Sequence, residues 1–189
     1  MTSPVTWIVL GLAALLLLWL LFTYNGLVAL RARVAQAFGD IDVQLKQRRD
    51  LIPNLVETVK GYAGHERGTL EAVVRARNAA AGAQGPAETV TSEAALQGAL
   101  GRLFALSETY PDLKANAHFQ ALQEQLADIE NKLAAARRFF NNAVAEYNAA
   151  IAAVPGVLLA GPLGLRPQAS FDVGEVERKA LDAPPAVRF

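Results

Sequence analysis

Residues that could carry out chemistry are sparse in this sequence. The chain has no cysteine, which excludes disulfides, thiolate nucleophiles and cysteine-ligated metals. Its two histidines, His65 and His118, lie far apart, and the residue four positions after His65 is Thr69, where a zinc-binding helix would need a second histidine. There is also no glycine-rich phosphate loop, nucleophile elbow or catalytic pair of carboxylates. The sequence therefore predicts a protein that is not an enzyme and has no cofactor, metal or small-molecule substrate.

The densest group of charges lies at residues 40–50, and one of its members is out of place. Lys46 is spaced i,i+4 from both Asp42 and Asp50, as opposite charges are on ordinary exposed helices. Arg48 instead falls on an apolar stripe between Leu45 and Ile52. A guanidinium there needs a carboxylate or carbonyl partner inside the protein, and Glu130 or Asp50 could supply it. We interpret Arg48 as a structural residue that sets helix register, with a partner-binding site as the alternative.

Asparagines are scattered near the expected helix faces, at Asn54, Asn141, Asn142 and Asn148. A buried amide can fix the register and oligomeric state of packed helices. We expect Asn54 and Asn148 to act with Arg48 as buried polar register residues, in preference to binding a ligand.

The charge balance excludes one large class of partners. Lys and Arg together number 18, as do Asp and Glu, so the formal net charge is zero. A nucleic-acid-binding protein usually shows a strongly basic face. We therefore expect no nucleic-acid partner.

The N-terminal segment predicts a membrane anchor. Residues 5–22 contain no charged residue, and an apolar run of about 18 residues is long enough to cross a bilayer as a helix. Trp7, Trp19 and Tyr24 lie towards its two ends, where aromatic rings favour the headgroup level. A cleaved signal peptide is the alternative, but the residues before the run include no Lys or Arg. We expect residues 1–24 to be a retained single-pass transmembrane helix.

The orientation follows from the basic residues that flank this span. None precedes it, whereas Arg31 and Arg33 follow it. The positive-inside rule then predicts an N-terminus outside the cell and a C-terminal domain in the cytoplasm.

Apolar periodicity predicts an all-α fold for residues 25–155. Side chains repeat every three or four residues from Leu27 to Tyr62, and again in one long helix over 112–154. Two shorter helices are expected at about 69–83 and 91–109, the latter with Thr91 or Ser92 as its N-cap. Pro53 should kink or break the first helix. The result is an N-terminal transmembrane helix continuous with an antiparallel four-helix bundle of two long and two short helices.

The mismatch in helix length leads to a hypothesis of self-association. If the short helices pack at one end, the membrane-proximal halves of the long helices form a two-helix stalk. Two helices alone cannot bury wide apolar stripes, and exposed apolar patches usually mark interfaces. We expect a homo-oligomer that assembles through Val34, Phe38, Ile41, Phe139, Phe140, Val144 and Tyr147.

The segment that follows the last helix is apolar and rich in Gly and Pro. We expect residues 156–171 to pack on the bundle end or to contact the membrane surface or a neighbouring subunit, with Leu158, Leu159 and Leu163 as the membrane-proximal contacts. Residues 172–189 are expected to be a flexible tail.

Several stretches resemble the LemA family. The longest is DIDVQLKQRRDLIPNLVETVKGYA at residues 40–63, and shorter ones are YNGLV at 24–28, YPDLKA at 110–115 and Tyr147-Asn148. The resemblance implies a bacterial membrane protein with one N-terminal span and a helical bundle, but it implies no agreed biochemical activity. The chain departs from the family's pattern after the last helix, where relatives tend to be rich in Phe.

These inferences together favour a non-enzymatic structural or scaffolding protein of the bacterial inner membrane that self-associates through its stalk. The alternative is an adaptor or sensor that presents its bundle to a membrane-bound partner, such as a protease or a secretion component.

Overall fold

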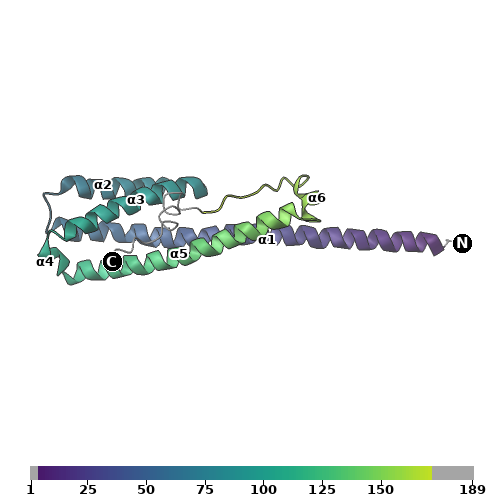
Figure 1. Ribbon diagram of the computed structural model, residues 1–189, viewed down its shortest axis with the longest axis horizontal. Helices are drawn as coiled ribbons and strands as arrows, with labels where there is room; N and C mark the ends of the chain where they lie inside the picture. The colour runs from purple at the N-terminus through teal and green to yellow at the C-terminus, as the bar shows by residue number, and fades with distance from the viewer. Residues whose placement is uncertain (1–3, 172–189) are drawn as a thin grey trace, which may run out of the picture. The chain divides into compact units, whose positions relative to one another are not determined.

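The computed structural model describes residues 4–171 and confirms the all-α fold. Within this range there are helices, turns and loops but no strand (Figure 1). The expected tail, residues 172–189, lies outside the described residues. The helices are α1 (Pro4–Lys60), α2 (Arg67–Gly82), α3 (Gly85–Ser107), α4 (Pro111–Lys114), α5 (Ala117–Ala152) and α6 (Gly156–Ala160).

The described residues form two compact units, and both α1 and α5 contribute to each of them. The anchor unit comprises residues 4–40 and 136–170, and the bundle unit comprises residues 41–135 with Phe171. We describe each unit by itself.

In the bundle unit, apolar faces of four helices surround one core. Ile52 and Leu55 of α1, Leu103 of α3 and Phe119 of α5 are all fully buried, and Val73 supplies the corresponding contact from α2. The expected kink or break at Pro53 did not produce a helix end, because α1 continues through it to Lys60. The burial of Ile52 and Leu55 on either side of the proline holds the helix together despite the lost backbone donor.

The expected start of the second short helix was wrong. Helix α3 begins at Gly85 rather than near residue 91, and Thr91 does not cap it, since its hydroxyl donates to the carbonyl of Ala87 one turn earlier. The Glu88 carboxylate instead accepts from the backbone N–H of Gln84 at 2.9 Å. An acidic residue at the N-terminus of a helix also interacts favourably with the positive end of the helix dipole.

The long last helix is interrupted near its start. A one-turn helix, α4, ends at Lys114, and α5 begins three residues later. The side chain of Asn116 accepts from the backbone N–H of Phe119 at 2.9 Å, which is the geometry of an N-cap. This cap starts α5 with Phe119 already directed into the core.

In the anchor unit, α1 packs against α5 in antiparallel fashion. The rings of Phe38 and Phe140 lie 5.7 Å apart, and Arg33 forms an ion pair with Glu146 at 2.8 Å. Residues 4–26 of α1 lack such cover, and none of the apolar window in this part of the helix is buried (Figure 1). The chain therefore carries one N-terminal helix that is long and apolar enough to span a membrane, which indicates membrane anchoring.

Candidate functional site

A buried cluster of charges joins three helices of the bundle unit. Arg48 of α1, only 6% exposed, lies 3.3 Å from Glu130 of α5 and 3.7 Å from Glu93 of α3. Arg49 approaches the other oxygen of Glu93 at 3.5 Å and also donates to the carbonyl of Ala80 at 2.9 Å. Two guanidinium groups thus share one carboxylate that is 1% exposed. These contacts connect α1, α3 and α5 through charged side chains, and a register-setting role for Arg48 stays a prediction.

The sequence predicted the Arg48–Glu130 contact of this cluster but not the part that Glu93 plays in it. Burial of Arg48 and its pairing with Glu130 are confirmed. Glu93 was missed, although it lies on the same stripe of α3 as Leu96 and Leu100 and is therefore as exceptional as Arg48.

A cavity of about 400 Å³ adjoins the cluster, with the Arg48 and Glu130 side chains on its wall. Its other lining groups are the amides Gln97 and Gln123 and apolar residues such as Phe104. The charged and amide side chains can donate and accept hydrogen bonds, but no Ser, Thr, Cys or Lys nucleophile lines the cavity. Among residues 4–171, no three acidic, His or Cys side chains are grouped to hold a metal ion.

One carboxyl near the cluster is electrostatically perturbed. Partial desolvation raises the pKa of Asp42 from its ordinary value, and the positive charge of Arg49 opposes this by lowering it. Asp42 itself is exposed. The perturbation is that of a carboxyl beside a packed helix surface.

A second hollow lies on the surface between α1 and α2, and we call it the α1–α2 groove. It has a volume of about 720 Å³ and is lined by Val56, Glu57, Lys60, Gly64, Arg67, Leu70, Glu71, Val74 and Arg75. Three of these residues are aliphatic, and Val74 is 40% exposed. The charged residues around them form two ion pairs, Glu57 with Lys60 at 3.6 Å and Glu71 with Arg75 at 3.3 Å.

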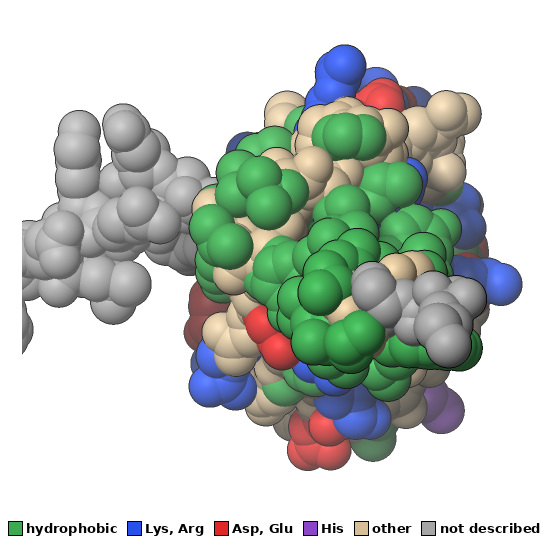
Figure 2. Space-filling view, turned by 90° about the vertical axis from the view of Figure 1, so that its right-hand side faces the viewer, with side chains coloured by type: hydrophobic (Ala, Val, Ile, Leu, Met, Phe, Trp, Pro, Cys, Tyr) green, Lys and Arg blue, Asp and Glu red, His purple; other side chains and the backbone are tan. Residues whose placement is uncertain are grey.

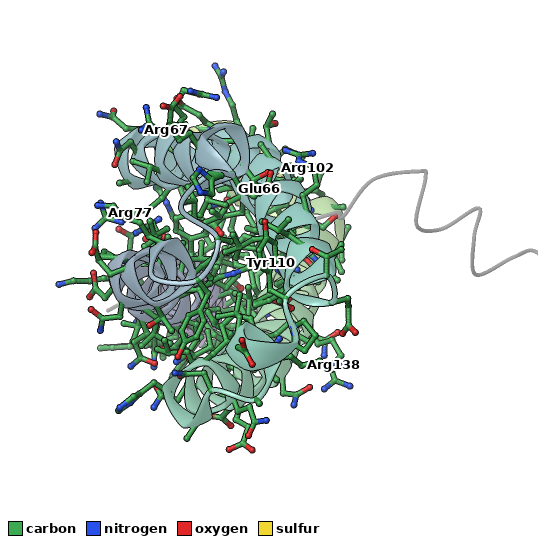
Figure 3. All side chains as sticks on the ribbon, turned by 90° about the vertical axis from the view of Figure 1, so that its left-hand side faces the viewer. Glu66, Arg67, Arg77, Arg102, Tyr110 and Arg138 are labelled. Carbon is green, nitrogen blue, oxygen red and sulfur yellow. The ribbon has the colours of Figure 1, made fainter. Side chains whose placement is uncertain are left out.

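The remaining cation of the groove is Arg67, in the first turn of α2 (Figure 3). Within the described part of the chain it is exposed and makes no ion pair. Among residues 4–171, the α1–α2 groove therefore combines an apolar floor with one cation that makes no ion pair.

The expected self-association stripe is mostly covered within one chain. Val34, Ile41, Phe140, Val144 and Tyr147 are each at most 2% exposed, and Phe38 is half-buried. The prediction that these side chains are stranded on an open two-helix stalk is wrong. Only Phe139, at 49%, is exposed.

Next to Tyr147, the prediction lacked the segment after α5, while the ring of Phe140 packs on that of Phe38. In the anchor unit this segment folds back, so that residues 164–168 line one small cavity together with Tyr147 of α5 and Arg31 of α1. Asn148 holds the returning chain through two hydrogen bonds to the backbone of Gln168, donating to its carbonyl at 2.8 Å and accepting from its N–H at 2.9 Å.

The two asparagines expected to set register behave differently. Asn148 is half-buried, and the hydrogen bonds described above clamp a loop instead of pairing two helices. The expected burial of Asn54 is wrong, because its side chain is exposed. Asn54 and its neighbour Pro53 both lie on the exposed side of α1.

The three leucines expected near the membrane also differ from one another in solvent exposure. Leu158 and Leu163 are 61% and 40% exposed, whereas Leu159 is half-buried against the protein. Leucines 158 and 159 are neighbours in the short helix α6, so they project from different faces of it.

Comparison with known proteins gives a consistent result. Residues 37–189 match the model of the LemA family. The magnetosome protein MamQ of Magnetospirillum gryphiswaldense is 27% identical over 191 positions that cover 87% of this chain and 69% of MamQ. The protein LemA of Metamycoplasma hominis is 26% identical over 162 positions, covering 84% of this chain and 73% of the relative. A magnetosome protein MamQ of Paramagnetospirillum magneticum is 25% identical with 87% and 69% coverage.

Proposed function

The chain belongs to the LemA family, and from this premise we propose that it is a non-enzymatic, membrane-anchored adaptor that binds a partner protein through its helical bundle. Membrane association itself rests on the uncovered apolar helix and the family match. The adaptor role, the absence of an enzymatic activity and the identity of the partner belong to the proposal.

The single observation that carries the proposal is the α1–α2 groove. A volume of about 720 Å³ is large enough to accept several side chains of a partner segment. Its aliphatic floor of Val56, Leu70 and Val74 favours apolar side chains. Burial of each such side chain contributes about 1.5–3 kcal/mol of transfer free energy before the entropic cost of association.

The charge of the groove defines the partner more narrowly. Since Glu57 and Glu71 are already paired with Lys60 and Arg75, the cation near the floor that has no ion pair with a described residue is Arg67. A charge-assisted contact to a carboxylate is the interaction that would complement it. The partner is therefore a peptide or helix that carries aliphatic side chains beside an acidic residue.

We place the protein in the bacterial inner membrane with its N-terminus outside and its bundle in the cytoplasm. The support is the asymmetry of the basic residues, because Arg31 and Arg33 follow the span and none precedes it. A membrane-bound protease or secretion component would meet the bundle on that side.

A self-assembling scaffold is less well supported by the geometry. Its contact surface was to be the stripe of α1 and α5, and the side chains of that stripe are buried within one chain apart from Phe139 and part of Phe38. We therefore favour the adaptor over a homo-oligomer that forms through this stripe.

Site-specific photo-cross-linking in living cells tests the adaptor role. A photoreactive phenylalanine at Val74, on the floor of the groove, should yield one discrete adduct with a second protein. The same residue at Val43, which is 52% exposed elsewhere on α1, is the matched control. Arg67→Glu in the Val74 cross-linking chain should abolish the adduct, because it reverses the charge that meets the partner.

Two results would overturn the proposal. One is an identical pattern of adducts from Val43 and Val74, which would show that the groove has no selectivity. The other is an adduct whose mass is that of two copies of this chain.

A further inference from the structure

The chain turns back after α5 in a short segment that leaves aliphatic side chains uncovered. Val154, Val157, Leu158 and Leu163, which we call the α6 patch, are 73%, 46%, 61% and 40% exposed. Val157 and Leu158 belong to α6, and Val154 and Leu163 lie in the turns before and after it; Ala160 of α6 is buried. One face of α6 therefore packs on the anchor unit while the other carries apolar side chains without cover.

The position of this patch along α1 follows from the pairing of the two long helices. Phe38 is opposite Phe140, and Arg33 is opposite Glu146. In an antiparallel pair the rise per residue is equal, so the register carries on from these contacts. It brings the last turn of α5 opposite about Leu27 of α1. The burial of both Ile151 and Leu27 agrees with this pairing.

Helix α6 is fixed at this level and does not hang free. A Cβ atom on Gly156 would overlap the carbonyl oxygen of Ala150, so only glycine lets α6 begin directly against the last turn of α5. The backbone N–H of Leu165 donates to Ala160 at 2.9 Å, and Asn148 clamps Gln168 further along.

The same level is close to the end of the membrane span. The uncharged apolar run ends at Phe22, five residues before Leu27, which corresponds to about 7–8 Å along a helix. The headgroup layer of each leaflet is about 5–8 Å thick. The α6 patch thus lies at headgroup depth once α1 crosses a bilayer.

The charges near the patch agree with its depth. Figure 2 looks at the molecule from the N-terminal end of α1 and shows hydrophobic side chains gathered at this end, which is the end that carries the apolar span. A membrane crossed by residues 5–22 would cover this end. The cavity beside it is lined by Arg31 and Arg166, cations that favour anionic headgroups.

We propose that the α6 patch is an interfacial membrane contact, in which Val154, Val157, Leu158 and Leu163 insert into the headgroup region beside the transmembrane helix. The contact gives the anchor unit a second point of attachment, which restricts its tilt and rotation about the span. The inference rests on membrane anchoring and is independent of the adaptor role, so either can fail alone.

Depth-dependent fluorescence quenching in the full-length chain tests the contact. Because the sequence has no cysteine, Leu158→Cys provides a unique site for an environment-sensitive dye. The labelled protein is reconstituted into vesicles of phosphatidylcholine and phosphatidylglycerol, with or without lipids that carry a quencher close to the headgroup. We expect quenching at Leu158 to be at least about twofold stronger than at a solvent-facing site.

Phe139→Cys is the matched control, because Phe139 is a similarly exposed apolar residue of the same unit, about four turns further from the end of α5. Equal quenching at the two positions would overturn the proposal. So would a Leu158 signal that resists lipid quenching and varies with the protein-to-lipid ratio, because a second copy of the chain would then cover the patch.

Discussion

The two compact units differ in what they bury. The bundle unit buries charge, since Arg48 and Glu93 lie inside it and are compensated by one another. The anchor unit keeps its ion pair of Arg33 and Glu146 on the surface, with both side chains more than half exposed, and leaves apolar side chains uncovered. The first arrangement compensates its charges inside the protein, and the second leaves an apolar surface that a bilayer could cover.

The largest expected effect distinguishes the buried ion cluster from the surface ion pair. Glu93→Gln leaves two guanidinium groups near a neutral amide, and breaking a buried pair typically lowers the free energy of unfolding by about 3–5 kcal/mol. Arg33→Ala removes an exposed pair and should cost only about 0–1 kcal/mol. Urea unfolding of the detergent-solubilised full-length protein, followed by circular dichroism, measures both. Equal losses would show that the cluster is not effectively buried.

The neighbouring residues Phe139 and Phe140 test whether the apolar stripe of the anchor unit is buried within one chain. Phe140, at 1% exposure, should lose about 3–4 kcal/mol of stability when changed to Ala, because a cavity remains. Phe139→Ala removes an exposed ring and should change the stability by less than about 1 kcal/mol. The same unfolding measurement applies. If Phe140→Ala left the free energy of unfolding of the monomer unchanged but dissociated an oligomer, the hypothesis of self-association through this stripe would be supported instead.

A smaller effect is expected where the returning segment is clamped. Asn148→Ala removes both hydrogen bonds to Gln168 and should cost about 1–2 kcal/mol. Hydrogen exchange at residues 164–170 should rise, while exchange in the bundle unit stays constant. Asn142→Ala, at an exposed position of the same helix, serves as the control. Unchanged protection in the Asn148 variant would contradict the clamp.

The smallest effect is a pH dependence in the bundle unit. The pKa of Asp42 is raised in the fold, chiefly by desolvation, so its charged form opposes folding above that pKa and the penalty disappears as pH falls through it. Asp42→Asn should therefore be slightly more stable than the native chain at neutral pH and lose this advantage below the ordinary pKa of 3.8. If the stability advantage of Asp42→Asn over the native chain increased as the pH fell, the argument would be contradicted.

The sequence predicted the helices and the faces that they bury, because apolar periodicity records burial directly. The sequence also identified Arg48 as unusual, because a charged residue on an apolar stripe is easy to recognise. Glu93 escaped notice because the helix that carries it was expected to begin near Thr91. An acidic residue in a first turn is ordinary, so the true start at Gly85 was needed to reveal its burial.

What covers a face could not be predicted from periodicity. The stripe of Phe140, Val144 and Tyr147 was identified correctly as apolar, but the chain then returns past Tyr147 in an irregular segment rich in Gly and Pro. The path of that segment depends on side-chain contacts such as those of Asn148 with Gln168, twenty residues apart. Such contacts have no periodic signature, so a face closed within the chain resembled an interface.

The adaptor role is tested most directly by native mass spectrometry of the full-length protein released from its own membranes. We expect one or few copies of this chain with one other protein in fixed ratio, and loss of that protein in the Arg67→Glu variant. Large homogeneous assemblies of this chain alone, unchanged by Arg67→Glu, would contradict the account.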